Sequence, residues 1–555
     1  MTQSTPRLAA PILASPRRTR LAARLIAPLA FAASLFGITP TFAQSNPVTI
    51  RAVMNGDLRS LDPLWTIAPQ TRIHAYMVYD TLLGADDQLK IQPQMVDRWT
   101  ESADRLTYTF TLRDKLTFSD GTPVTATDVI ASLKRWMVVD SAGQYLAEYL
   151  AALEAPDANS FVIRLKEPFP QLIYSLGKPS AVPTFVFPAR IIDGLPASKQ
   201  LTDPTGSGPF IMKRDEWQSG NKVVYIRNPT YVPRAEPASA ISGGKRVHVD
   251  RVEWLNITDP ATQVAALKTG EIDFIQFAPP DILADLRKTK GIVVKPLWPV
   301  GIQGHMRLNW TNPPFDNQGI RHAIHNFVFQ PDMIMAVMGN MEDGKVCGAM
   351  MMCGSATGSE AGAELLLSTD PAPVRLKRGI EMMRAAGYKN EPIVILDATD
   401  QVMQHNATLV LVDAMRKAGV NVDLQTVDWA TVTSRRTIRG PGSNGWHIIM
   451  TTGGQVAGVN PAFSILAPAR CEKSFPGWPC DQRYEDLRSA WLKESDPGKS
   501  RALAVDIQKR GMEIGHSIPY GEYLLPAAWR DSLDGVVSVP EHVVFWGMRK
   551  RPGAR

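Results

Sequence analysis

Alternation of apolar and polar side chains marks several strands in the first half of the chain. The cleanest case is residues 106–112, where every second side chain is apolar, which predicts a half-buried strand. Four shorter apolar runs predict further strands, at residues 48–53, 161–165, 223–226 and 252–255. A helix is expected at 125–136, because Thr125 and Asp128 can satisfy its first free amides, and another at 262–269, stopped by Gly270.

The later half alternates helices with strands. Periodic segments predict helices at 375–386 and 407–418, and apolar runs predict strands at 392–396 and 420–424. This order is typical of a parallel sheet covered by helices. A buried strand at 446–450 and helices at 484–493 and 499–514 complete the pattern.

The N-terminal 43 residues differ sharply in composition from the rest of the chain. They carry five arginines and no Lys, Asp or Glu, and the arginines are followed by an apolar run of about 14 residues. The small residues Thr41 and Ala43, two positions apart, then match the cleavage site of a signal peptide. This is the pattern of a secretory signal peptide cleaved near Ala43, and the run is too short for a spanning helix, which needs roughly 20 residues. We therefore expect a mature protein in the periplasm.

Charge and length restrict the remaining chain. The arginines of residues 1–43 account for five of the six net positive charges, so the body is nearly neutral and no nucleic-acid partner is expected. A single core rarely grows beyond roughly 250–300 residues, and the chain has 555, so at least two lobes are expected.

Four cysteines, Cys347, Cys353, Cys471 and Cys480, predict disulfides in an exported protein. The near pairs would close small loops, and the crossed pairings are an alternative. Neither spacing is CxxC and no histidine lies close, so no metal site is expected there. His322 and His325 lie one helical turn apart without further ligands, and we expect no metal or cofactor anywhere in the chain.

An ordered series of motifs runs through the chain from about residue 48. The motifs occupy residues 60–63, 78–83, 93–99, 108–113, 118–129, 206–210, 227–231, 267–274, 308–310, 314–317 and 320–324. Together they resemble family 5 of the bacterial solute-binding proteins, the dipeptide-, oligopeptide- and nickel-binding group. Most of these motifs are interpreted as structural, with Tyr79, Trp99 and Phe118 expected in cores.

The resemblance implies the two-lobed periplasmic-binding-protein fold (type II, the large family 5 variant), an α/β fold with mixed sheets, flanking helices and a hinge. Residues 44–280 would form lobe I, with an extra subdomain at about 95–205. Residues 281–515 would form lobe II, and 516–555 would return to lobe I. The protein would bind a small molecule between the lobes as a monomer and deliver it to an inner-membrane ABC permease.

The resemblance also bears on the ligand. In peptide-binding relatives an acidic residue just after a late strand binds the peptide's ammonium group, whereas residues 446–458 here contain no Asp or Glu. Because a buried ammonium without a carboxylate is costly, a carboxylated or aromatic solute is favoured over an ordinary peptide. The expected ligand-binding residues are Trp65, Arg439, Trp446, Thr452, Gly453, Gly454 and Gln455.

Two other functions are weighed against this one. A dipeptide- or oligopeptide-binding protein is the alternative within the same family. A secreted hydrolase has no support in the sequence, because Ser207 lacks the Gly-x-Ser-x-Gly spacing and no His-Glu-x-x-His or Gly-x-x-x-x-Gly-Lys occurs.

Overall fold

The first described strand, β1 (Thr49–Val53), lies inside a seven-stranded mixed sheet of order β12-β19-β11-β1-β10-β9-β8. It pairs in parallel with β10 and β11, whereas β8, β9, β12 and β19 join in antiparallel register. The partner strands are β8 (Phe210–Met212), β9 (Lys222–Arg227), β10 (Arg251–Leu255), β11 (Phe274–Ile275), β12 (Ile292–Pro296) and β19 (Pro526–Arg530). The computed structural model describes residues 47–179, 182–196, 199–298, 301–442, 444–454, 460–464 and 467–551, so the expected signal peptide lies outside it.

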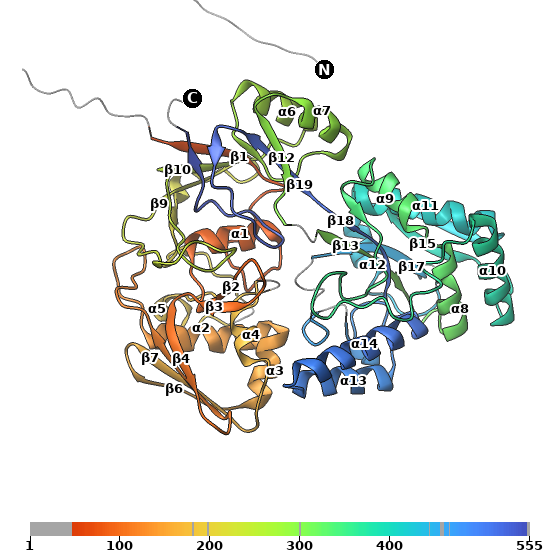
Figure 1. The fold of residues 1–555 in the computed structure, drawn as a ribbon, viewed down its shortest axis with the longest axis horizontal. Helices are drawn as coiled ribbons and strands as arrows, with labels where there is room; N and C mark the ends of the chain where they lie inside the picture. Colours follow the sequence, from red (N-terminus) through yellow and green to blue (C-terminus); the bar gives the residue numbers. More distant parts are fainter. Residues whose placement is uncertain are drawn as a thin grey trace, which may run out of the picture. The chain divides into compact units, whose positions relative to one another are not determined.

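A second large sheet has the order β14-β18-β13-β17-β15-β16. Its strands are β13 (Ile302–Leu308), β14 (Gly344–Lys345), β15 (Ile393–Ala398), β16 (Val422–Val427), β17 (Ile448–Gly453) and β18 (Ile518–Tyr523). The parallel pairing expected for the helix–strand repeat is confirmed, because β15 pairs in parallel with β16 and with β17. Figure 1 shows this sheet with helices around it, among them α8 (Gln318–Ala323), α9 (Gln330–Met338), α10 (Ala372–Ala385) and α11 (Val402–Lys417).

A separate four-stranded antiparallel sheet, β4-β5-β7-β6, forms within the segment expected as an extra subdomain. Its strands are β4 (Val96–Glu101), β5 (Thr107–Leu112), β6 (Leu150–Asp157) and β7 (Ser160–Leu165). Helix α2 (Ala126–Val139) begins where the sequence predicts, since Asp128 Oδ2 accepts the Thr125 backbone N–H at 2.8 Å. Helices α3 (Ser141–Tyr149) and α4 (Leu172–Gly177) come next.

The chain passes between the two large sheets at two places. Strand β12 still belongs to the seven-stranded sheet and β13 to the six-stranded sheet, and the chain returns between β18 and β19 (Figure 1). Both passages lie later in the sequence than the expected lobe boundaries at 280 and 515, because β12 and β18 extend each sheet beyond them. The division into lobes stays a prediction. By sheet membership, β12 belongs with the elements expected in lobe I and β18 with those expected in lobe II.

Helix α1 (Pro69–Val78) is not predicted by the sequence pattern. Nine of its ten residues are buried, so it has no polar face to produce a helical periodicity. The motif directly after α1 is explained by an ion pair, in which Lys245 Nζ donates to Asp80 Oδ1 at 2.7 Å with both side chains almost fully buried. Tyr79 and Phe118 are buried as expected, and Trp99 is half-buried and stacked on Phe110.

The disulfides join the near pairs, Cys347 to Cys353 and Cys471 to Cys480. The crossed pairings considered from the sequence are therefore not formed. The remaining predicted helices are α6 (Pro260–Thr269), α13 (Gln482–Lys493) and α14 (Pro497–Ile514), each close to its expected range. Within the described ranges, no helix is both long and apolar enough to cross a bilayer.

Glu522 on β18 is a buried carboxylate whose ionisation makes stability depend on pH. Its side chain is 3% exposed, it accepts the Cys353 backbone N–H at 2.7 Å, and Lys345 Nζ lies 3.9 Å away. Burial raises the pKa of Glu522 to about 7. Because the unfolded carboxyl titrates near about 4.3, this group's contribution to stability is fully present below that pH and is lost as the pH rises through about 7.

We predict that Glu522→Gln removes this dependence. Between about pH 4 and pH 8 the free energy of unfolding of the variant should rise relative to the unmutated protein by on the order of 1–3 kcal/mol. Urea unfolding of both proteins at several pH values measures the difference. A difference that stays constant across this range would contradict the assignment.

Candidate functional site

The main cavity of the protein has a volume of about 1030 Å³. One side is lined from α1, from the loops beside β10 and β11, and from Glu541 in the C-terminal segment. The other side is lined from β13, β17, the start of α11 and helix α12 (Trp429–Arg435). Leu525 and Pro526, at the passage between β18 and β19, also line it. The cavity is thus bounded by residues associated with both large sheets.

One face of α12 forms part of the wall. Trp429, Thr433 and Arg436 line the cavity, and their spacing of four and three residues places them on the same side of the helix. Asp428 caps the helix, and the Trp429 backbone N–H donates to Asp400 Oδ1 at 2.7 Å. A half-buried indole and a guanidinium therefore face the same space.

Arg436 differs from its arginine neighbours. Its guanidinium lies 5.0 Å from the centre of the Phe475 ring, and among the described residues it has no carboxylate partner. Burial lowers the pKa of Arg436. Arg435 donates instead to the backbone carbonyls of Asn444 and Gly445. Arg439 forms an ion pair with Glu472, with 3.3 Å between the two charged groups, and does not line the cavity.

The end of β17 supplies three of the expected site residues. Thr452, Gly453 and Gly454 line the cavity, and Thr452 Oγ1 accepts from Gln404 Nε2 at 3.3 Å. Gln455 lies outside the described residues. The structure therefore brings Thr452, Gly453 and Gly454, but not the whole expected set, to the cavity; these three residues and those directly after them are called the β17 loop below.

Trp65, Trp446 and Arg439 are placed elsewhere. Trp446 is fully buried and packs on Trp478, with the ring centres 6.4 Å apart. Trp65 is half exposed and does not line the cavity. The sequence shows that residues 65 and 446 are tryptophans, but the direction in which each side chain points depends on packing that the sequence does not encode locally. These three residues therefore do not belong to the cavity wall.

Gly454 faces a carboxylate from the far end of the chain. A Cβ at this position would lie 2.5 Å from Glu541 Oε1. A glycine can leave room for a ligand, but at Gly454 that room is taken by Glu541. A carboxylate of the C-terminal segment therefore lies beside Gly454.

Glu541 is held by Arg72 of α1. Arg72 Nη2 and Glu541 Oε2 are 3.1 Å apart, and their side chains are 9% and 6% exposed. Both residues line the cavity. The sequence pattern predicts neither residue, because α1 shows no helical periodicity and Glu541 lies at the far end of the chain.

Burial favours the neutral form of His305, which lines the cavity, and of His325, which does not. Burial lowers the pKa of His305 to about 3, and Ser517 Oγ lies 3.2 Å from its Nδ1. His325 is buried with its pKa lowered to about 4, and its Nδ1 contacts the His322 carbonyl. Within the described part of the chain, only Cys347, Cys353 and Glu522 cluster like metal ligands, but the two cysteines form a disulfide and offer no thiolate.

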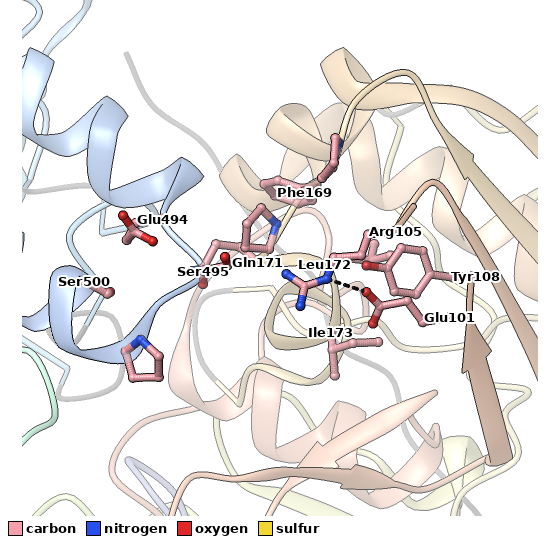
Figure 2. A pocket seen from close by; sticks show the side chains of 13 residues that line it. Glu101, Arg105, Tyr108, Phe169, Gln171, Leu172, Ile173, Glu494, Ser495 and Ser500 are labelled. Carbon is pink, nitrogen blue, oxygen red and sulfur yellow. Dashed lines mark ion pairs between the residues drawn. The ribbon is translucent and has the colours of Figure 1, made fainter. Parts of the chain in front are cut away.

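A smaller hollow of about 280 Å³ lies away from the cavity, between the four-stranded subdomain and the start of α14. Figure 2 shows Glu101, Arg105 and Tyr108 on one side of it and Glu494, Ser495 and Ser500 on the other. Glu101 and Arg105 pair with each other at 3.2 Å and are 38% and 55% exposed. Such a solvated pair is a weak ligand anchor, so the larger cavity is the better candidate.

Two sheets connected by two passages, with a large cavity lined from both, are the architecture of a binding protein for small solutes. Over residues 90–467 the sequence matches the bacterial extracellular solute-binding proteins, family 5 Middle, and the chain belongs to this family.

Relatives and solved structures agree with this membership. A probable peptide ABC transporter periplasmic-binding protein of Sinorhizobium fredii is 36% identical over 511 residues, covering 90% of this chain and 93% of that protein. The murein tripeptide binding protein of Escherichia coli has a TM-score of 0.73 at 18% identity, covering 91% of this chain and 99% of that one. A binding protein from A.tumefacien R10 in complex with mannopinic acid has a TM-score of 0.73 at 19% identity, covering 91% and 100%. The fold expected from the sequence is confirmed.

We predict that the contact between Gly454 and Glu541 is tight enough to make their substitutions non-additive. Gly454→Ala should destabilise the protein by roughly 1–3 kcal/mol, because the new methyl group can be accommodated only if Glu541 moves away from Arg72. In a Glu541→Ala background the same change should cost much less. Chemical denaturation of the four proteins gives the coupling energy, and strictly additive effects would contradict the contact.

Proposed function

We propose that this protein is the periplasmic substrate-binding component of an ABC importer, and that its ligand is a small organic solute carrying a carboxylate. It captures the solute in the main cavity, closes on it and presents it to the permease. We further propose that residues 1–43 are removed near Ala43 on export and that the mature protein acts as a monomer without enzymatic activity. Family membership and the Sinorhizobium fredii relative support the transport role.

The observation that carries the ligand class is Arg436. A guanidinium in the wall of a cavity, without a carboxylate partner among the described residues, is ready to bind an incoming carboxylate. Arginine forms two parallel hydrogen bonds with such a group, and partial burial strengthens them. Phe475 beneath the guanidinium holds its plane in place.

The remaining wall suits the organic part of such a solute. Phe277, Met403, Trp429 and Phe475 are half-buried cavity residues that can pack against an apolar or aromatic group. A volume of about 1030 Å³ is at the upper end of small-molecule sites, so a solute larger than a single amino acid fits.

A hydrolase is not supported by the same cavity. Ser517 and His305 come together there as a hydroxyl beside an imidazole, which is the contact a nucleophile and its base would make. With its pKa lowered to about 3, however, His305 is a poor general base at neutral pH. We therefore propose binding rather than turnover.

A dipeptide or oligopeptide is the second candidate ligand. Glu541 places a carboxylate beside the β17 loop, where it can bind an ammonium group, and this weakens the argument from the acid-free loop sequence. The Sinorhizobium fredii relative is a probable peptide-binding protein. Native mass spectrometry of protein purified from its source distinguishes the candidates, since a released free-amine peptide would overturn the first.

We predict that Arg436→Gln weakens binding of carboxylates selectively. A charge-assisted pair contributes about 1.5–3 kcal/mol, so affinity should fall roughly tenfold to hundredfold. Isothermal titration with phenylacetate and with phenylacetamide, which differ only in the charged group, measures the loss. The acid should lose affinity while the amide does not.

Arg439→Gln is the matched control, because Arg439 lies three residues further along the chain and points away from the cavity toward Glu472. It should leave both affinities unchanged. Equal losses in the two variants, or no preference for the acid over the amide in the unmutated protein, would refute a role for Arg436.

A further inference from the structure

Four buried arginines of this protein are surrounded by acceptors. Arg321 donates to three backbone carbonyls, and Arg488 donates to two carbonyls and to Glu485. Arg375 donates to the carbonyls of several loop residues, and Arg135 makes a two-pronged contact with Asp62. Their exposed fractions are 7% or less. None of these four lines the main cavity.

Arg72 is buried to the same degree but is bonded differently. It is 7% exposed, and its ion pair with Glu541 at 3.1 Å is its one side-chain partner among the described residues. Within the same part of the chain its Nε has no hydrogen-bond acceptor, which is also true of Arg135 and Arg375, so Arg72 differs from them in having no acceptor for its Nη groups other than Glu541. A guanidinium carries five N–H groups, so most of the donors of Arg72 are unused.

An under-bonded guanidinium is costly in a core but not in a binding site. A buried donor without an acceptor has lost the hydrogen bonds it made with water in the unfolded chain. Native structures therefore seldom contain such donors. Arg72 lines the cavity, where a ligand can accept hydrogen bonds from its Nη groups. Glu541 meanwhile offsets its charge and orients the guanidinium, which makes Glu541 a positioning residue.

We propose that Arg72 is a second oxyanion site, and that the ligand is therefore a dicarboxylate held between Arg72 of α1 and Arg436 at the end of α12. This rests on the proposed binding of a carboxylate at Arg436 and specifies its substrate class further. The two arginines come from elements that pack with different sheets, so one dianionic ligand bridges both walls of the cavity. Lys178, another buried cation of the wall, is already paired with Asp140 at 2.8 Å.

The test uses probes that differ by a single charge. Linear dicarboxylates from succinate to sebacate are titrated into the full mature protein, each alongside its own monoamide. At the best chain length the diacid should bind roughly tenfold or more tightly than the monoamide, because the second carboxylate gains a charge-assisted contact at Arg72. If the monoamide binds as tightly as its diacid at every chain length, the proposal is overturned, and the group that accepts from Arg72 is a neutral one.

Two variants separate ligand binding at Arg72 from a structural role. Glu541→Gln removes the ion pair but keeps the cation, and the double variant R72Q/E541Q removes both charges. Glu541→Gln should keep or increase the preference for the diacid, whereas R72Q/E541Q should abolish it by lowering the affinity of the diacid more than that of the monoamide. If Arg72 only stabilises the fold, Glu541→Gln and R72Q/E541Q will behave alike: either both lose the preference for the diacid over its monoamide, or both keep it.

The failure of this proposal differs from failure of the proposed function. If monoacids bind through Arg436 and diacids gain nothing, the carboxylate role stands and the role of Arg72 falls. If Arg436→Gln has no effect but R72Q/E541Q still abolishes the preference for diacids, Arg72 stands as an oxyanion site and the role of Arg436 falls. Thermal unfolding of each unliganded variant confirms that the comparison is made on folded protein.

Discussion

The structure depends on a constraint of connectivity, namely that the chain runs between its two large sheets at only two places in the described topology. Strands β18 and β19 are separated by two residues yet belong to different sheets. Leu525 and Pro526 at this passage line the main cavity, and so does Ser517 just before β18. The cavity is therefore formed where the sheets are joined, and any rotation about the passages changes its shape directly.

Buried polar groups of this protein divide into those satisfied by the protein and those left for a ligand. Pairs such as Asp80 with Lys245 and Asp140 with Lys178 are buried and complete, so they fix elements in place without binding anything. Arg436 and Arg72 are the arginines of the described wall whose donors are largely unused. The chemistry of the site follows from this difference in bonding rather than from the number of charges.

The elements with local patterns could be predicted from the sequence. Strand β5 alternates cleanly, α2 begins at its capping residues, and the repeat around β15 and β16 indicates a parallel pair, because each signal lies within a few residues. Helix α1 escaped prediction since burial on all sides leaves no periodicity. The family membership was predicted from ordered motifs rather than from any active-site pattern.

The candidate site was predicted only in part, for the same physical reason. Thr452, Gly453 and Gly454 lie at the end of a recognisable strand and line the cavity, whereas Arg72 and Glu541 are brought together by the fold from opposite ends of the sequence. Trp446 was assigned to the site by its position beside β17, but its direction is decided by packing against Trp478. No local pattern encodes such contacts.

The close approach of Glu541 to Gly454 also has an evolutionary consequence. The two positions cannot change independently, because a side chain at 454 and a long acidic one at 541 require the same space. Related chains are then expected to carry an acid either in the β17 loop or in the C-terminal segment, seldom in both. The exchange of one for the other would be a route by which a binding protein of this family changes its ligand while keeping its fold.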